Sequence, residues 1–122
     1  MKAYTDLEQS IKLAKILPIE SADMRYAPFG DKNPWVWSED VKLLEKDAIP
    51  CWSLAALLEV LPKGEYEEIN LCFGGYNGSE YIPEWFCSYE QQEPFIIEIS
   101  KASNAIDACY ELVLKLHELK KI

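Results

Sequence analysis

The longest apolar stretch of the chain, residues 49–62, constrains the fold most strongly. It reads Ile-Pro-Cys-Trp-Ser-Leu-Ala-Ala-Leu-Leu-Glu-Val-Leu-Pro, with a proline near each end and a single charged residue. Ser53 predicts an N-cap, because its hydroxyl can accept a hydrogen bond from a free N–H of the first turn. Trp52 and Leu57 then stand at the two positions of a hydrophobic staple, and Pro62 stops the helix. A short helix that is apolar nearly all round is typical of a buried segment.

Two further helices are predicted near the chain ends. Thr5 and Glu8 have the spacing of a capping box, and the apolar stripe that follows predicts a helix over residues 6–17. Ser103 or Asn104 can cap a second helix, whose apolar stripe continues almost to the C-terminus. Lysines near its end suit the negative end of the helix dipole.

Between the central and last helices the apolar period changes to two. Alternation over residues 67–73 predicts a strand with one face inward, and Asn77-Gly78 is a strong hairpin signal. Residues 81–89 form a second expected strand, in which Pro83 suggests an edge or an irregular start. Residues 95–99 form a third, mostly apolar strand, so the three indicate an antiparallel meander.

The expected fold class is therefore α+β. We expect a single two-layer domain, residues 1–122, with a three-stranded antiparallel meander packed against about three helices. Residues 18–48 are not assigned a place in it. They combine turn formers with large apolar side chains, and Ser38-Glu39-Asp40 could begin a short helix that ends at Lys46.

The net charge of −9 is concentrated in one part of the chain. Residues 64–100 contain no lysine or arginine and eight acids: Glu65, Glu67, Glu68, Glu80, Glu84, Glu90, Glu93 and Glu98. Such a surface would suit a basic partner and repel nucleic-acid phosphates. The N-terminal residues have no apolar signal region, and no stretch reaches membrane-spanning length, so we expect a cytoplasmic protein with no membrane partner.

The cysteines and the single histidine do not predict a catalytic or metal site. No two of the four cysteines have the C-x2-C spacing of a zinc or redox motif, and buried free cysteines usually act as small apolar residues. His117 has no nucleophile positioned near it by any local motif. The Gly74–Gly78 segment has no adjacent lysine or arginine, which disfavours a phosphate loop. We therefore predict no catalytic residue, cofactor or metal.

Aromatic side chains are the strongest candidates for a functional surface. Period-two alternation on residues 81–89 directs some of them outward, and tryptophan and tyrosine are preferred anchors of interfaces. The structural alternative is that the 18–37 segment covers them. The candidate interaction residues are Trp35, Trp37, Tyr81, Trp85 and Tyr89.

Residues 49–62 and 104–121 resemble a group of small uncharacterised proteins from gut Bacteroidetes, found often in prophages and mobile elements. The opening Leu7-Glu8-Gln9-Ser10, with Ala22-Asp23-Met24, is similar to the same group. The shared residues are those assigned to caps and core. The resemblance implies a cytoplasmic phage- or mobile-element-associated protein and transfers no catalytic residue.

Three functional hypotheses follow. The first is a non-enzymatic interaction module, which binds an unknown protein through the acidic, aromatic sheet or the 18–37 segment; a homodimer through the sheet is one form of it. The second is an acidic decoy that mimics nucleic acid, which requires the eight glutamates to lie on one continuous face. The third is an enzyme of unrecognised type, which requires a concave pocket with converging polar side chains.

Overall fold

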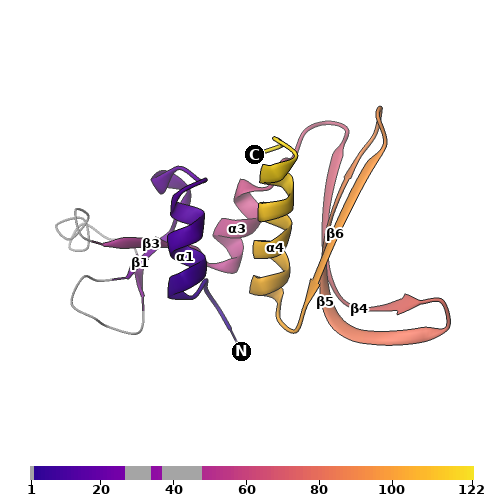
Figure 1. Ribbon diagram of the computed structural model, residues 1–122, viewed down its shortest axis with the longest axis horizontal. Coiled ribbons are helices and arrows are strands. Elements are labelled where there is room, and N and C mark those ends of the chain that lie inside the picture. Colours follow the sequence, from indigo (N-terminus) through magenta and orange to yellow (C-terminus); the bar gives the residue numbers. More distant parts are fainter. Residues whose placement is uncertain (1, 27–33, 37–47) are drawn as a thin grey trace.

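A computed structural model of the chain describes residues 2–26, 34–36 and 48–122. Its helices are α1 (Leu7–Ala14), the 3-10 helix η1 (Ile19–Ser21), α3 (Leu54–Val60) and α4 (Ala105–Glu118). Its strands are β1 (Met24–Tyr26), β2 (Trp35–Val36), β3 (Ile49–Cys51), β4 (Glu67–Asn77), β5 (Glu80–Gln91) and β6 (Ile96–Ala102). Figure 1 shows the helices between two sheets, with β1 and β3 on one side and β4–β6 on the other.

The N-caps of the central and last helices are confirmed. The Ser53 hydroxyl accepts a hydrogen bond from the N–H of Ala56 (3.2 Å) at the start of α3. The Asn104 side chain accepts one from the N–H of Asp107 (2.8 Å) at the start of α4. Each cap satisfies a donor that the first helical turn would leave free.

The start of α1 differs from the prediction, because Asp6 and not Thr5 is its N-cap. The Asp6 carboxylate accepts from the N–H of Gln9 (2.8 Å), and the Gln9 side chain accepts from the N–H of Asp6 (3.1 Å). This is a capping box displaced by one residue. Thr5 is fully buried, and its hydroxyl accepts from the backbone N–H of Trp52 (3.1 Å). Thr5 is therefore a link between chain segments.

α1 also ends at Ala14, three residues before the predicted end. The N–H groups of Lys15 and Ile16 each bond to the carbonyl three residues back, at 3.3 and 3.0 Å, which tightens the last turn. Beyond η1, the chain enters a small antiparallel sheet of order β2-β1-β3 that was not predicted. The possible helix at residues 38–46 lies outside the described residues.

The meander is confirmed, with the strand order β4-β5-β6. Asn77 pairs with Glu80, so the hairpin loop consists of Gly78 and Ser79, one residue later than the Asn-Gly pattern indicated. Gly78 has a φ of +66°, which suits a two-residue loop with glycine in its first position.

Pro83 lies in a β-bulge of the central strand. After the Phe73–Trp85 pair the register shifts, leaving Pro83 and Glu84 opposite Gly74. Gly74 has a φ of +87°, a conformation that favours glycine. A bulge accommodates a proline that cannot donate to the ladder, and it bends the strands locally.

The core lies between α3, α4 and the inner face of the meander. Seven α4 residues are buried: Ile106, Ala108, Cys109, Tyr110, Leu112, Val113 and Leu116. Trp52 and Leu57, the expected staple, are both 0% exposed, and the Trp52 indole N–H donates to Ser21 Oγ at 2.9 Å. The α+β class with helices packed on the meander is therefore the observed architecture.

Candidate interaction surfaces

The residues chosen from the sequence as an interaction surface do not lie together. Tyr81 is 49% exposed, whereas Trp85 is half-buried and packs against the core. Trp35 belongs to β2, where its backbone pairs with Arg25 of β1 in the other sheet. Trp37 lies outside the described residues. Tyr89 is fully buried, so its selection as an exposed anchor was wrong.

Tyr89 is buried because it lies on the inner face of β5, in the core that α4 covers. Its hydroxyl donates to the Glu67 carboxylate, and the hydroxyl oxygen lies 2.9 Å from Gln91 Oε1. Lys121 Nζ also donates to Gln91 Oε1, at 2.5 Å, which connects the end of α4 to β5. Burial, together with the Glu67 carboxylate, raises the pKa of Tyr89 to about 12. This tyrosine therefore ties α4 to the sheet.

Three exposed aromatic groups lie instead toward the end of the β4–β5 hairpin: Phe73 is level with the last β5–β6 pair, and Tyr76 and Tyr81 lie beyond it. The last pair between β5 and β6 is Trp85–Ala102, so the hairpin beyond it has only two strands. Figure 1 shows this part bending away from α4. We call the end of the hairpin, from the Phe73–Trp85 pair to the turn, the aromatic arm; its ring residues are Phe73, Tyr76, Tyr81 and Trp85.

Two cross-strand ring pairs run along the aromatic arm. The rings of Phe73 and Trp85 are edge-to-face at 5.5 Å, and those of Tyr76 and Tyr81 are tilted at 5.4 Å. Phe73 is 54% and Tyr76 75% exposed. The alternation over residues 67–73 and the Asn77-Gly78 turn signal predicted this hairpin, but neither pattern shows how far along it the helices cover the sheet.

The eight glutamates of residues 64–100 do not form one face. Glu67 lies on the inner face beside Tyr89, whereas Glu68 and Glu90 are cross-strand neighbours on the outer face. Glu84 forms an ion pair with Lys101 at 3.6 Å. The others lie in loops, turns or on separate strands: Glu65, Glu80, Glu93 and Glu98.

A groove of about 610 Å³ lies between β6 and α4. Its lining includes Ile99 and Lys101 from β6, and Asp107, Glu111 and Lys115 from α4. It is a concave site with converging polar groups, of the kind that an enzyme would require.

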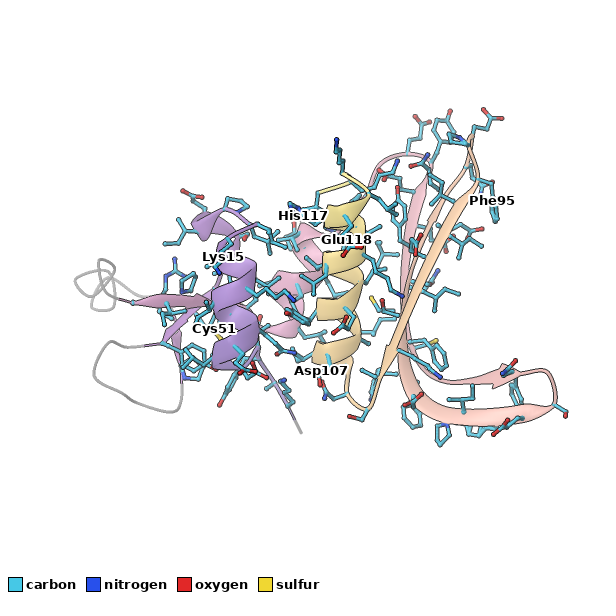
Figure 2. The ribbon with its side chains drawn as sticks, in the orientation of Figure 1. Lys15, Cys51, Phe95, Asp107, His117 and Glu118 are labelled. Carbon is cyan, nitrogen blue, oxygen red and sulfur yellow. The ribbon has the colours of Figure 1, made fainter. Side chains whose placement is uncertain are left out.

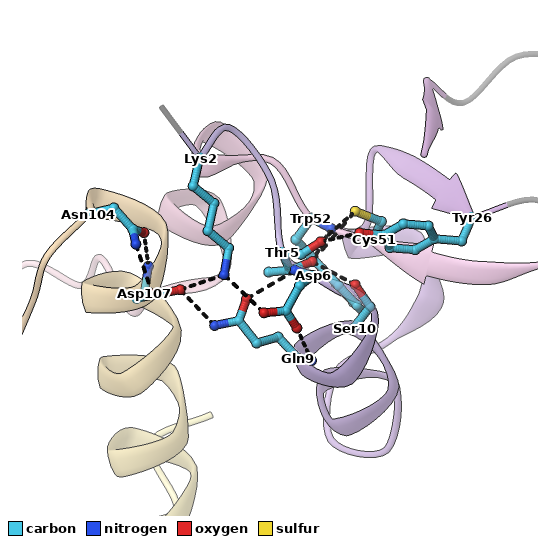
Figure 3. A network of polar contacts seen from close by, with 10 residues as sticks. All are labelled: Lys2, Thr5, Asp6, Gln9, Ser10, Tyr26, Cys51, Trp52, Asn104 and Asp107. Atoms are coloured by element: carbon cyan, nitrogen blue, oxygen red, sulfur yellow. Dashed lines mark hydrogen bonds and ion pairs between the residues drawn. The ribbon is translucent and has the colours of Figure 1, made fainter. Parts of the chain in front are cut away.

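Asp107 is the most heavily bonded group of this groove (Figure 3). Its carboxylate accepts hydrogen bonds from Lys2 Nζ, Gln9 Nε2 and Asn104 Nδ2, each at 2.8 Å. Partial burial disfavours the charged form, but these three bonds and the Lys2 charge hold the pKa of Asp107 below its ordinary value. A carboxylate held in this way is a poor proton acceptor, and its arrangement joins the chain start and α1 to α4.

We expect Asp107→Asn to lower the free energy of unfolding at neutral pH, with a difference that shrinks in acid. The folded-state pKa lies below the ordinary value of 3.8, so the carboxylate contributes fully above that value. The contribution is lost as the pH falls through the folded-state pKa. Urea unfolding of both proteins at neutral and acidic pH measures this.

The matched control is Glu118→Gln, which changes an exposed carboxylate at the other end of α4 (Figure 2). It should show little stability difference from the wild type at any of these pH values. Equal stability of Asp107→Asn and the wild type at neutral pH would contradict the structural role of Asp107.

The cysteines and His117 do not assemble into a reactive site. Cys51, Cys87 and Cys109 are buried, and Cys72 is exposed on β4. Cys109 Sγ lies 3.4 Å from Cys87 Sγ in the core, where this contact and burial raise the pKa of Cys87. His117 is exposed at the end of α4 (Figure 2). Within the described ranges, no three His, Cys, Asp or Glu side chains form a possible metal site.

Comparisons with known proteins do not identify the chain. No protein-family model, curated protein or solved structure matches it. In the part of the chain that the structure describes, none of the helices combines the length and apolar character needed to span a membrane.

Proposed function

We propose that this chain is a non-enzymatic protein-interaction module, which binds a basic segment of another protein through the aromatic arm. We further propose that it works in the cytoplasm as a phage- or mobile-element-associated protein, as its resemblance implies. The partner is a protein and not a nucleic acid, because the acidic sheet repels phosphates.

One observation carries the proposal. Among the described residues, all five aromatic side chains classed as exposed fall within the stretch that has eight glutamates and no basic residue: Tyr66, Phe73, Tyr76, Tyr81 and Phe95. Aromatic side chains, tyrosine and tryptophan above all, are favoured anchors of protein interfaces. The surrounding carboxylates make the surface negatively charged, so a complementary partner is basic.

The geometry of the arm supports binding through its rings. Cross-strand contacts between Phe73 and Trp85, and between Tyr76 and Tyr81, restrict the rings before any partner arrives. Side chains that are already ordered lose less conformational entropy on binding. Glu80 lies on the same hairpin and can attract lysine or arginine to it.

The two alternatives receive less support. The decoy hypothesis requires one continuous row of carboxylates, whereas Glu67 faces the core and Glu68 the opposite side. The enzyme hypothesis has a groove, but its best-positioned carboxylate, Asp107, already accepts three hydrogen bonds.

Removing the two tyrosine rings should weaken binding of a basic peptide at least tenfold, because anchors of this kind each contribute more than about 1 kcal/mol. The probes are two synthetic peptides of matched length, in which leucine alternates with arginine or with glutamate. Titration followed by NMR should shift resonances of residues 73–85 with the arginine peptide only. The variant Tyr76→Ala/Tyr81→Ala should then lose affinity.

The control variant is Leu119→Ala, which removes an exposed apolar side chain from the far end of α4. It should bind the arginine peptide as the wild type does. Shifts centred outside the arm, or equal affinity of the double tyrosine variant, would refute the proposed surface.

A further inference from the structure

The strand β6 has a free edge with exposed apolar side chains. It is an outer strand of the meander, and among the described residues it pairs with β5 alone. The side chains on its inner face point toward the core, and Ser100 among them is 3% exposed. Ile97 and Ile99 lie on the outer face and are 46% and 52% exposed. Natural edge strands are usually short or protected by charges and prolines, because free backbone groups invite another strand. Lys101 is the charged residue of this outer row, whereas Ile97 and Ile99 in the middle of the strand carry neither a charge nor a proline.

In the part of the chain that the structure describes, a side chain of α4 reaches this edge. Lys115 Nζ, from α4, donates to the carbonyl oxygen of Ile99 at 2.7 Å. The contact places the Ile99 carbonyl toward the groove and away from β5. Since backbone groups alternate sides along an antiparallel strand, Ile97 and Lys101 also direct their N–H and C=O groups to this free edge.

The edge is complementary to a second copy of itself. β6 spans Ile96–Ala102, and its middle residue is Ile99. An antiparallel pair of β6 strands about a twofold axis at Ile99 uses the full strand, placing Ile99 opposite Ile99 and Ile97 opposite Lys101. An axis at Lys101 would instead place two lysines opposite each other, which is destabilising.

The charges on α4 fit the same axis. A twofold axis perpendicular to the sheet keeps both copies of α4 on one face, side by side and antiparallel. Glu111 and Lys115 are one turn apart and both line the groove. Long helical side chains lean toward the helix N-terminus. Lys115 Nζ, which bonds to the Ile99 carbonyl, therefore lies level with the helical turn between Glu111 and Lys115. The proposed axis at Ile99 passes at this same level. Glu111 of each copy then lies opposite Lys115 of the other.

We propose that the occupant of this edge is a second copy of the chain, and that two meanders join through β6 into one continuous six-stranded sheet. On dimerisation, the N–H of Ile99 from one copy replaces Lys115 at the Ile99 carbonyl of the other. Lys115 is released to form an ion pair with Glu111 across the axis. Both aromatic arms stay free in this dimer, so it does not depend on the proposed partner binding.

Charge exchange tests the dimer directly. Sedimentation velocity over a wide concentration series should show a monomer–dimer equilibrium for the wild type. Glu111→Lys and Lys115→Glu should each weaken the dimer at least tenfold, since each places like charges across the axis. The double variant Glu111→Lys/Lys115→Glu should regain dimerisation. The control Glu118→Lys changes an exposed glutamate of α4 that does not line the groove, and it should dimerise as the wild type does.

Cysteine crosslinking tests the register. In a Cys72→Ser background, which removes the exposed native thiol, Ile99→Cys should form a disulfide-linked dimer on mild oxidation with diamide. Ile97→Cys alone should not, because its expected partner is Lys101 of the other copy. A mixture of Ile97→Cys and Lys101→Cys proteins should crosslink.

Several results would overturn the dimer. These are a wild type that stays monomeric at every concentration, single charge reversals that leave the mass unchanged, and an Ile99→Cys protein that does not crosslink. If peptide binding at the aromatic arm fails while these tests succeed, the proposed function is wrong and the dimer stands.

Discussion

Leu57→Ala should lower the free energy of unfolding by about 2–5 kcal/mol, the range measured for such truncations in well-packed cores. Leu57 is 0% exposed and belongs to the cluster where α3 meets α4 and the meander. Truncation removes the apolar burial of the side chain and leaves a cavity that the surrounding helices and sheet can only partly fill. The effect is expected on stability and not on peptide binding, because Leu57 is buried in the core and is not part of the aromatic arm.

Guanidinium unfolding followed by tryptophan fluorescence measures this loss, since Trp52 lies in the same buried cluster. Leu7→Ala is the control, because Leu7 is 47% exposed at the start of α1 and its removal should change stability by less than about 0.5 kcal/mol. A Leu57→Ala protein as stable as the wild type would contradict the buried position of α3.

Local patterns in the sequence were sufficient to predict the elements on which the core depends. Ser53 caps α3 as its hydroxyl indicated, and the apolar stripe after Asn104 became the most buried helix of the described chain. The switch from helical period to alternation after Pro62 located the meander. These signals are reliable because each cap or stripe depends on residues within a few positions of it.

The errors arise where a distant segment decides the outcome. Thr5 and Asp6 are both good N-cap residues, so local chemistry could not choose between them. Which of the two caps α1 depends on Trp52. The buried backbone N–H of Trp52 donates to Thr5 Oγ1, so Asp6 and not Thr5 caps the helix. In the same way, the pairing of Met24 with Cys51 builds a small sheet that neither short strand indicates alone.

The candidate surface shows the same limit. Alternation correctly separates the two faces of β5, but it does not show which face α4 covers or how far along the hairpin this cover extends. Tyr89 lies under α4 and is 0% exposed, whereas Tyr81, on the same strand, lies beyond β6 and is 49% exposed. The burial of a side chain on a sheet depends on where the packing helix lies, and this position cannot be predicted from the residues of the strand alone.

Thr5→Val is the sharpest test of the corrected N-terminus, with an expected loss of about 1–3 kcal/mol of unfolding free energy. Valine matches the shape of threonine but cannot accept the hydrogen bond from Trp52 N–H (3.1 Å) or bond with Ser10 Oγ (2.8 Å). Thr5 and Ser10 are both 0% exposed, so water cannot replace the lost partner. Buried polar groups without a partner incur the full cost of desolvation.

A double-mutant cycle with Ser10→Ala separates this network from a simple cap. Because Ser10 bonds with Thr5, the double variant should lose less stability than the sum of the two single losses. Asp6→Ala should independently cost about 1 kcal/mol, as removal of an N-cap does. If Thr5 were the cap, Asp6→Ala would be neutral and the cycle additive. Urea unfolding of the four proteins of the cycle and of Asp6→Ala therefore decides whether Asp6 or Thr5 caps α1, and whether Thr5 and Ser10 act together in the core.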